Sequence, residues 1–151
     1  MPIKKWDRFI EEGKLKPAGI VVCLDTSCRF LIIRRAAIDE RAGQWTIPGG
    51  HIEDADCTIE DAAVRELEEE TGIICNTEDL VYLGEPKPEK YYFLTYKWRG
   101  DINVDIPNPE TGEIEHDDYK WATINDIKDI DNSEIPIYLL EKALEMSKNA
   151  K

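Results

Sequence analysis

The sequence is poor in basic residues and has no apolar run of membrane-spanning length. Its 151 residues contain 19 Lys and Arg against 32 Asp and Glu, a net charge of −13, which argues against nucleic-acid binding through a basic surface. No stretch approaches the roughly 20 apolar residues that a membrane span requires, and the first six residues lack the apolar core of a signal peptide. We therefore expect a cytoplasmic protein that binds neither nucleic acid nor membrane.

Cysteine is also scarce. The four cysteines, at positions 23, 28, 57 and 75, form neither a CxxC pair nor a knuckle with histidine, so a zinc site is not expected and free intracellular thiols are the default. With 42% apolar residues, the chain can bury one core. We expect a single domain over residues 1–151, in which residues 1–16 form an amino-terminal extension.

The order of apolar segments predicts strands with helices interspersed. Trp6, Phe9 and Ile10 predict a short helix in the extension that ends at Gly13. Expected strands cover residues 18–24, 29–33, 80–83, 91–98 and 119–122, with a hairpin turn at 25–27, loops at 34–44 and 101–115, and a break at 86–88. A turn of helix is expected at 124–127 and a closing helix at 133–148 with Ser133 as its cap. This order indicates an α/β fold with a mixed sheet packed between helices.

The strongest helix signal begins at Thr58. Thr58 and Asp61 form an N-cap with an acidic third position, and apolar residues recur after them at spacings of three and four. The helix should continue to Thr71, where Gly72 can adopt the left-handed conformation that ends helices.

Three acids lie close together on this predicted helix. At 100° per residue, Glu66, Glu69 and Glu70 fall within roughly a 100° arc that overlaps the apolar stripe, so they face inward. They also lie in the last turns, where the helix dipole disfavours anions by about 0.3–1 kcal/mol each. Arg65 can pair with Glu69 one turn on, which leaves Glu66 and Glu70 in need of a cation. Hard oxygen ligands at this density suit Mg²⁺ or Mn²⁺.

A solvated acidic face is the ordinary interpretation of such a run, but the flanking residues argue against it. Pro48-Gly49-Gly50 precedes the helix, and the segment from Gly50 to Ile73 resembles the signature of the Nudix (MutT-like) hydrolases. The matching positions are Gly50, Arg65, Glu66, Leu67, Glu69, Glu70, Gly72 and Ile73. We identify residues 50–73 as a Nudix box.

The box departs from the family pattern in one place. The family has Glu after Gly and five intervening residues, whereas this chain has Asp56 at that position, and eight residues instead of seven then separate it from Arg65. Either Asp56 takes the role of that Glu with Cys57 as an insertion, or Glu53 and Asp54 realign within the loop.

The resemblance implies a fold, a reaction and a set of site residues. The fold would be the Nudix α/β/α sandwich. The reaction would be attack of water on a nucleoside diphosphate linked to another moiety. Mg²⁺, which Mn²⁺ can replace, would be held by Glu66, Glu69 and Glu70 with the carbonyl of Gly49. Arg65 would be a positioning residue in the catalytic set. The general base would come from Glu66 or from a downstream loop, where Glu115 is the first candidate and Glu113 the second.

Substrate contacts are indicated by arginines and tyrosines. Arg34 and Arg35, with Arg41 in the next loop, could clamp phosphates, although each is also an ordinary surface residue. Of Tyr91 and Tyr92, one should face a nucleobase and the other the core; we assign Tyr91 to the substrate.

Two subclass cues bear on the substrate itself. Tyr91 resembles the tyrosine of relatives that cleave dinucleoside polyphosphates, and Pro88 resembles the proline of those that act on ADP-ribose. Together they favour ADP-containing substrates such as ADP-ribose, diadenosine triphosphate and FAD.

Two further functions fit the same motif. One is a house-cleaning nucleoside triphosphate pyrophosphatase that acts, for instance, on oxidised dGTP. The other is a Nudix-fold module that binds a nucleotide without cleaving it, against which the intact helix acids count. The expected partner is a small nucleotide, and a homodimer is possible because relatives commonly form one.

Overall fold

The computed structural model describes residues 16–36, 41–130 and 134–149. The helix predicted from Trp6 to Gly13 therefore lies outside the described residues. The strands are β1 (Ala18–Cys23), β2 (Phe30–Arg35), β3 (Trp45–Thr46), β4 (Gly49–His51), β5 (Val81–Lys87), β6 (Lys90–Thr95) and β7 (His116–Ala122). The helices are α2 (Ile59–Thr71), α3 (Ile124–Lys128) and α4 (Ile137–Asn149), with a 3₁₀ turn at Thr77–Asp79. In these ranges no helix is long and apolar enough to cross a membrane.

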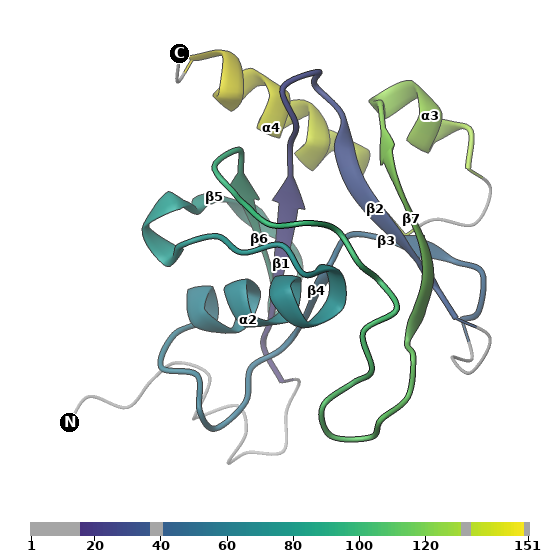
Figure 1. Ribbon diagram of the computed structural model, residues 1–151. Coiled ribbons are helices and arrows are strands. Elements are labelled where there is room, and N and C mark those ends of the chain that lie inside the picture. The colour runs from purple at the N-terminus through teal and green to yellow at the C-terminus, as the bar shows by residue number, and fades with distance from the viewer. Residues whose placement is uncertain (1–15, 37–40, 131–133, 150–151) are drawn as a thin grey trace.

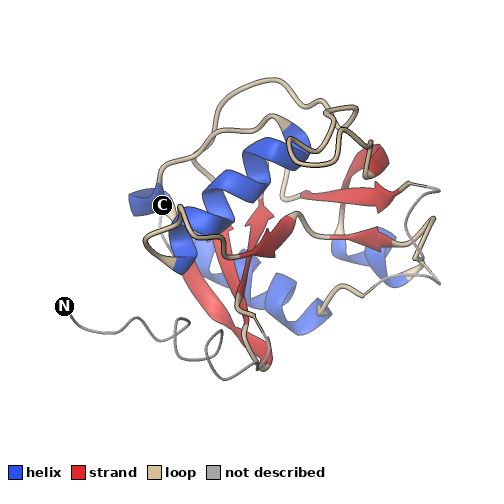
Figure 2. Cartoon of the chain, turned by 90° about the horizontal axis from the view of Figure 1, so that it is seen from below, coloured by secondary structure: helices blue, strands red, loops and turns tan. Residues whose placement is uncertain are grey.

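The strands form two sheets, which Figure 2 shows as separate groups. One sheet has the order β4-β1-β6-β5, and the other has the order β3-β2-β7. In the first sheet β1 runs parallel to β6 and antiparallel to β4, so the prediction of a mixed sheet is confirmed.

Helices cover both faces of the four-stranded sheet. Val21 and Cys23 of β1 pack in one apolar cluster with α2, whereas Val22 of the same strand packs in a second cluster with Leu139 and Leu140 of α4. This alternation follows from the two-residue period of a strand. Figure 1 shows α2 crossing β1, with α4 at the far end of the sheet. The arrangement is the expected α/β/α sandwich.

A glycine allows α2 to approach the sheet closely. A Cβ atom at Gly19 of β1 would lie 2.8 Å from the Cβ of Ala63 and 2.8 Å from the carbonyl oxygen of Ile59. No side chain fits between β1 and α2 at this point. The contact brings the acidic end of α2 against the edge strand β4.

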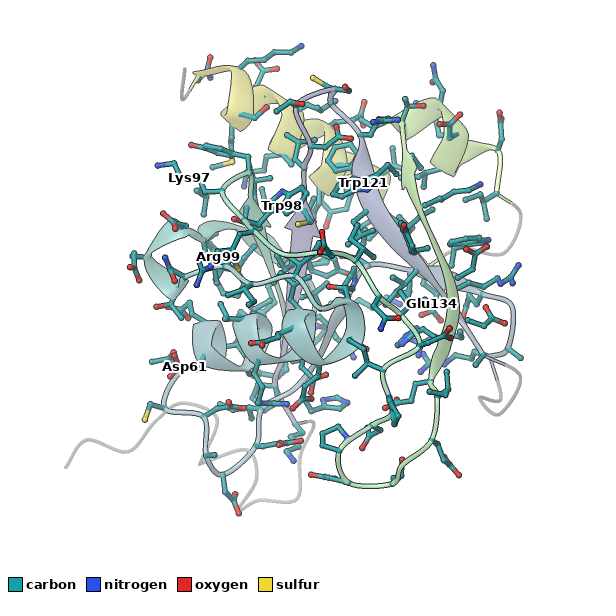
Figure 3. The ribbon with its side chains drawn as sticks, viewed as in Figure 1. Asp61, Lys97, Trp98, Arg99, Trp121 and Glu134 are labelled. Carbon is teal, nitrogen blue, oxygen red and sulfur yellow. The ribbon has the colours of Figure 1, made fainter. Side chains whose placement is uncertain are left out.

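A tryptophan pair joins the two sheets. Trp98, which follows β6, and Trp121 of β7 stack with ring centroids 5.3 Å apart and planes 18° from parallel, and both are labelled in Figure 3. The indole N–H of Trp98 also donates to the carbonyl of Leu24 at 3.2 Å. Trp121 therefore has a packing role between the sheets.

The predicted hairpin between the first two long strands was wrong. The turn is present, since the Asp25 carboxylate accepts hydrogen bonds from the backbone N–H groups of Ser27 and Arg29. The strands then meet only at a bridge between Leu24 and Phe30. Both edges of β1 are already paired, with β4 and β6, so β2 has no free edge to join and starts the second sheet.

Several predicted boundaries also moved. β5 continues through Pro86 to Lys87, which an edge strand tolerates because the missing N–H faces no partner. β2 extends to Arg35, so the predicted loop at 34–44 begins later. β7 begins at His116, before the predicted strand. The closing helix begins at Ile137, after Pro136, and its predicted cap Ser133 lies outside the described residues.

Candidate active site

Helix α2 has the predicted ends. The Thr58 hydroxyl accepts from the N–H of Asp61 at 3.0 Å, and the Asp61 carboxylate accepts from the N–H of Thr58 at 3.1 Å, which is a capping box. Gly72 ends the helix with φ of 80°, a left-handed conformation that suits glycine. Local sequence alone therefore sets the length of this helix and the positions of its acids.

Arg65 organises the acids around it. Its guanidinium donates to the Asp56 carboxylate twice, at 3.1 and 2.9 Å, and to the carbonyl of His51 at 3.1 Å. It also donates to Glu66 at 2.9 Å and to Glu69 at 3.1 Å, so the predicted pairing with Glu69 is confirmed. Burial alone would lower the pKa of Arg65, but the hydrogen bonds to Asp56 and Glu66 raise it, and the guanidinium stays charged.

The structure distinguishes the two alignments left open for the box. Asp56, whose side chain is only 5% exposed, makes the paired contact with Arg65. Glu53 lies farther from it, at 3.7 Å, and Asp54 is exposed. Asp56 therefore supports the arginine, and Cys57 is the extra residue of the loop.

This pairing predicts a pH dependence of stability. Burial alone would raise the pKa of Asp56, but hydrogen bonds from Arg65 and from the backbone hold it below its ordinary value. A carboxylate with a lowered pKa in the folded state contributes stability above its unfolded pKa, and loses that contribution as the pH falls through the folded pKa. Asp56→Asn should therefore lower the free energy of unfolding by about 1–3 kcal/mol at pH 7, with a smaller loss below about pH 4.

Urea unfolding of both proteins between pH 3 and pH 7 measures this difference. Asp54→Asn is the matched control, because the Asp54 side chain is exposed and lies two residues before Asp56 in the same loop. Equal losses in the two variants would contradict the assigned role of Asp56.

A cavity of about 610 Å³ opens beside these acids. Its walls come from both sheets, from the carboxyl-terminal part of α2 and from the start of α4. Glu66 and Glu70 line it, as do Gly49 and Gly50. Glu69 is not among the lining residues, since it turns toward Arg65.

Glycines let the two cavity acids reach the edge strand β4. The N–H of Gly49 donates to the Glu70 carboxylate at 2.7 Å. A Cβ atom at Gly50 would lie 2.4 Å from the carboxyl carbon of Glu66. Gly49 and Gly50 thus leave the space that both carboxylates occupy beside β4.

Both carboxylates hold their protons more strongly than usual. Burial raises the pKa of Glu66 to about 6, although Arg65 opposes the shift. Burial and the charge of Glu66 raise the pKa of Glu70 well above its usual range, while the Gly49 N–H and Arg35 oppose this. The raised pKa values mean that the charged forms of these two carboxylates are disfavoured, so a positive charge bound beside them would stabilise them.

The residues fit a divalent cation through two carboxylates. A bound cation would offset the repulsion between Glu66 and Glu70, and hard oxygen donors suit Mg²⁺ or Mn²⁺. Among the side chains that the structure describes, no group of three or more His, Cys, Asp or Glu is arranged to hold a metal ion. Glu69 is held by Arg65 and would have to leave it to become a third ligand. The Gly49 carbonyl as a ligand stays a prediction.

The loop at 101–115 brings another acid to the cavity. Glu115, which immediately precedes β7, lines it, and so does Asn108. The Asn108 side-chain amide donates to the Glu115 carboxylate. Glu115 also contributes to the raised pKa of Glu70. Of the two loop acids considered as a base, Glu115 faces the helix acids, whereas Glu113 is not among the lining residues.

The arginines predicted to contact the substrate do not all reach the cavity. Arg35 lines the cavity, but Arg34 does not: its guanidinium donates to Asp117 at 2.8 Å and lies over the Trp45 ring. Neighbouring residues of a strand tend to point to opposite faces, and the register with β7 also shifts between Arg34 and Arg35, so this correction depends on the tertiary pairing.

The tyrosines follow the same rule. Tyr92 lines the cavity, whereas Tyr91 packs in the core cluster under α2 and its hydroxyl donates to Glu89 at 3.1 Å. We therefore move the expected substrate contact from Tyr91 to Tyr92.

Sequence reasoning missed some lining residues altogether. Asn108, Lys90 and Glu134 line the cavity, and they lie in three separate segments of the chain. The sequence carries no local signal for them, because ordinary loop and strand-end residues of these types have no distinctive spacing. His116, 4% exposed, was also missed; it lies 3.7 Å from Glu70.

Comparisons with known proteins agree with this geometry. The NUDIX domain family matches residues 14–142. The chain is 30% identical over 125 residues to the phosphatase NudJ of Escherichia coli K12, which covers 81% of this chain and 78% of that protein.

Solved structures share the fold. A MutT NUDIX hydrolase from Burkholderia pseudomallei superposes with a TM-score of 0.65 at 22% identity, covering 83% of this chain and 95% of that one. An Ap4A hydrolase of C. elegans superposes with a TM-score of 0.63 at 20% identity, covering 87% and 98%. Together with the family match over most of the chain, the acids of α2 and their seats on β4 lead to one conclusion: this chain belongs to the Nudix hydrolase family.

Proposed function

We propose that this Nudix hydrolase is a metal-dependent pyrophosphohydrolase that cleaves nucleoside diphosphates linked to another moiety. The observation that carries the proposal is the pair Glu66 and Glu70, which share one cavity wall and both have raised pKa values. A chain that only bound nucleotides would gain nothing from holding two such acids together against their mutual repulsion.

The residues take distinct parts in this proposal. Glu66 and Glu70 would hold the divalent ion, which when bound screens the charge of the pyrophosphate and lowers the pKa of a water. Arg65 fixes Glu66 through a hydrogen bond of 2.9 Å. Arg35 supplies positive charge from the facing sheet. Glu115, oriented by Asn108, is the base candidate that reaches the same cavity from outside the helix.

We propose ADP-containing compounds as the preferred substrates, with ADP-ribose, diadenosine triphosphate and FAD as the first to test. Tyr92 and Ile20 both line the cavity and offer an apolar surface for a base or sugar. The C. elegans structural neighbour is an Ap4A hydrolase, which is compatible with a dinucleotide substrate.

The test is a substrate panel with two metals. Phosphate release after treatment with a phosphatase would be measured on ADP-ribose, diadenosine triphosphate, FAD, NADH and GDP-mannose, and release of inorganic pyrophosphate without phosphatase would be measured on dNTPs, with Mg²⁺ or Mn²⁺ or with EDTA. We expect turnover of ADP-linked compounds that depends on the metal. If no compound of the panel is hydrolysed with either metal although nucleotides bind, the proposal is overturned in favour of a binding module.

A graded set of glutamine variants tests the site within the same assay. Glu66→Gln should reduce kcat by about 10²–10⁴, because it removes a cavity carboxylate. Glu69→Gln should cost less, because Glu69 acts on Arg65 and not on the cavity. Glu68→Gln is the matched control, since its side chain is exposed on the same helix. A loss in Glu68→Gln equal to that in Glu66→Gln would contradict the assignment.

A second activity is favoured by the curated relative, which is named a phosphatase. The panel separates the candidates by their products. Release of inorganic phosphate without added phosphatase indicates removal of a terminal phosphate. Inorganic pyrophosphate with a nucleoside monophosphate indicates the house-cleaning type, and two phosphorylated fragments indicate the proposed reaction.

A further inference from the structure

The end of the cavity away from α2 is basic, although the chain as a whole carries a charge of −13. Lys87, at the end of β5, and Lys90, at the start of β6, both line the cavity, and Arg41 lines it from the loop before β3. We call these three residues the basic end. Lys90 is half-buried, whereas Lys87 and Arg41 are exposed.

The strand register separates the basic end from the acidic wall. Gly49 of β4, which binds Glu70, pairs with Ile20 of β1, and Ile20 pairs with Tyr92 of β6. Lys90 lies on that same strand β6, and Lys87 of β5 is its partner. Neighbouring strands lie about 4.8 Å apart, so the backbone of Lys90 is about 10 Å and the backbone of Lys87 about 14 Å from β4 across the sheet.

The charges at the basic end act on one another. Burial lowers the pKa of Lys90, and the positive charges of Arg41, Lys87 and Arg35 lower it further, while Glu134 opposes them. Arg35 also acts on Glu70, so it lies within electrostatic reach of both the acidic wall and the basic end.

Among the described residues, Glu134 forms an exposed ion pair with the basic end. Glu134 lies 3.5 Å from Arg41, and the two side chains are 41% and 49% exposed. Exposed pairs of this kind contribute little, so Arg41 can exchange Glu134 for an anion on a ligand. A phosphate there would contact cations that are already brought together.

The two phosphorus atoms of a pyrophosphate share a single bridging oxygen, whereas the backbones that carry the acidic wall's seat and the lysines are two to three strands apart. Tyr92 and Ile20 line the cavity between them, and they give the intervening part of a ligand an apolar surface.

We propose that Lys87, Lys90 and Arg41 bind a second anionic group of the substrate, a phosphate or polyphosphate carried beyond the pyrophosphate that is cleaved. The proposal rests on the proposed function for where the cleaved bond lies. It deepens that function, because it selects substrates with additional phosphate over ADP-ribose itself.

Direct binding tests the anion site without catalysis. Inorganic tripolyphosphate would be titrated calorimetrically in EDTA into the wild-type protein and into the double variant Lys87→Ala/Lys90→Ala. Loss of two charge-assisted contacts should weaken binding on the order of tenfold or more. The matched control is Lys97→Ala/Lys128→Ala, which removes the same charge from exposed positions that do not line the cavity. Lys97 and Glu134 are well separated in Figure 3.

Two outcomes of the titration would overturn the proposal. One is equal affinity in the wild type and in Lys87→Ala/Lys90→Ala. The other is an equal loss of affinity in the cavity variant and in the control variant, since that would trace binding to net charge alone. Circular dichroism of both variants confirms that they are folded before the comparison is made.

Kinetics then test selectivity with substrates that differ only in phosphate. The pairs are ADP-ribose with its 2′-phosphorylated form, and diadenosine triphosphate with diadenosine pentaphosphate. We expect the wild type to favour the more phosphorylated member of at least one pair by about tenfold in kcat/KM, and the cavity variant to lose that preference. If the wild type shows no preference within either pair, the proposed selectivity for additional phosphate is overturned. If the wild type hydrolyses none of the four compounds with either metal, the proposed function fails, and the titration still decides the anion site.

Discussion

Replacement of Glu70 by glutamine should stabilise the metal-free protein at pH 8 while it removes most of the hydrolytic activity. Glu70 is 15% exposed and lies near Glu66, Glu115 and His116. Glutamine keeps an oxygen to accept from the Gly49 N–H, which Glu70 now bonds at 2.7 Å. It removes a poorly solvated charge, so we expect a gain of about 1–3 kcal/mol in the free energy of unfolding.

The sign of this effect depends on pH. The folded-state pKa of Glu70 is raised, so the folded protein binds its proton more tightly than the unfolded chain does. For such an acid, stability falls as the pH rises from the unfolded pKa through the folded pKa. Glutamine resembles the protonated form, so the variant should exceed the wild type most at pH 8 and least near pH 5.

Urea unfolding in EDTA at pH 5 and pH 8 measures the stability, and ADP-ribose hydrolysis with Mg²⁺ measures the activity, where we expect a loss of about 10³-fold or more. Glu68→Gln on the outer face of α2 controls for the change in net charge. A Glu70→Gln protein that is less stable than the wild type at pH 8 would show that the carboxylate is a structural partner. If the Glu70→Gln variant keeps full activity, Glu70 has no part in hydrolysis.

Alanine at the two neighbouring glycines should separate stability from activity. At Gly49 the added Cβ would lie 2.6 Å from the carbonyl oxygen of Gly19 and 2.7 Å from the Cα of Ile20, and backbone of a paired strand cannot easily move. Gly49→Ala should therefore cost about 3 kcal/mol or more of folding free energy. At Gly50 the added Cβ would meet the end of the Glu66 side chain at 2.4 Å, which can rotate away.

Gly50→Ala should consequently fold with near wild-type stability and lose activity by about 10²-fold or more, because Glu66 leaves the cavity wall. Thermal unfolding and the ADP-ribose assay on both variants provide the comparison. The opposite pattern, a stable Gly49→Ala and an unstable Gly50→Ala, would contradict the packing described for β4. An active Gly50→Ala would show that hydrolysis does not need Glu66 in its present position.

The sequence alone determined the features that depend on local contacts. The capping box at Thr58, the left-handed Gly72 and the pairing of Arg65 with Glu69 all join residues within one helix or at its ends. Such interactions depend on residue spacing, and spacing is read from the chain directly. The mixed sheet followed from the order of apolar segments, whereas the sandwich followed from the resemblance of residues 50–73 to the Nudix signature.

Only the tertiary structure decided which of the candidate side chains share the cavity. Strand β6 is covered on both faces, so its apolar pattern could not show that Tyr92 and not Tyr91 faces the site. Arg34 and Arg35 are distinguished by pairing with β7, which follows some eighty residues later. Lys90, Arg41 and Glu134 meet because β6, the loop before β3 and the start of α4 converge. Contacts between distant segments depend on register and on which strand edges are already paired, and neither is encoded in the spacing of nearby residues.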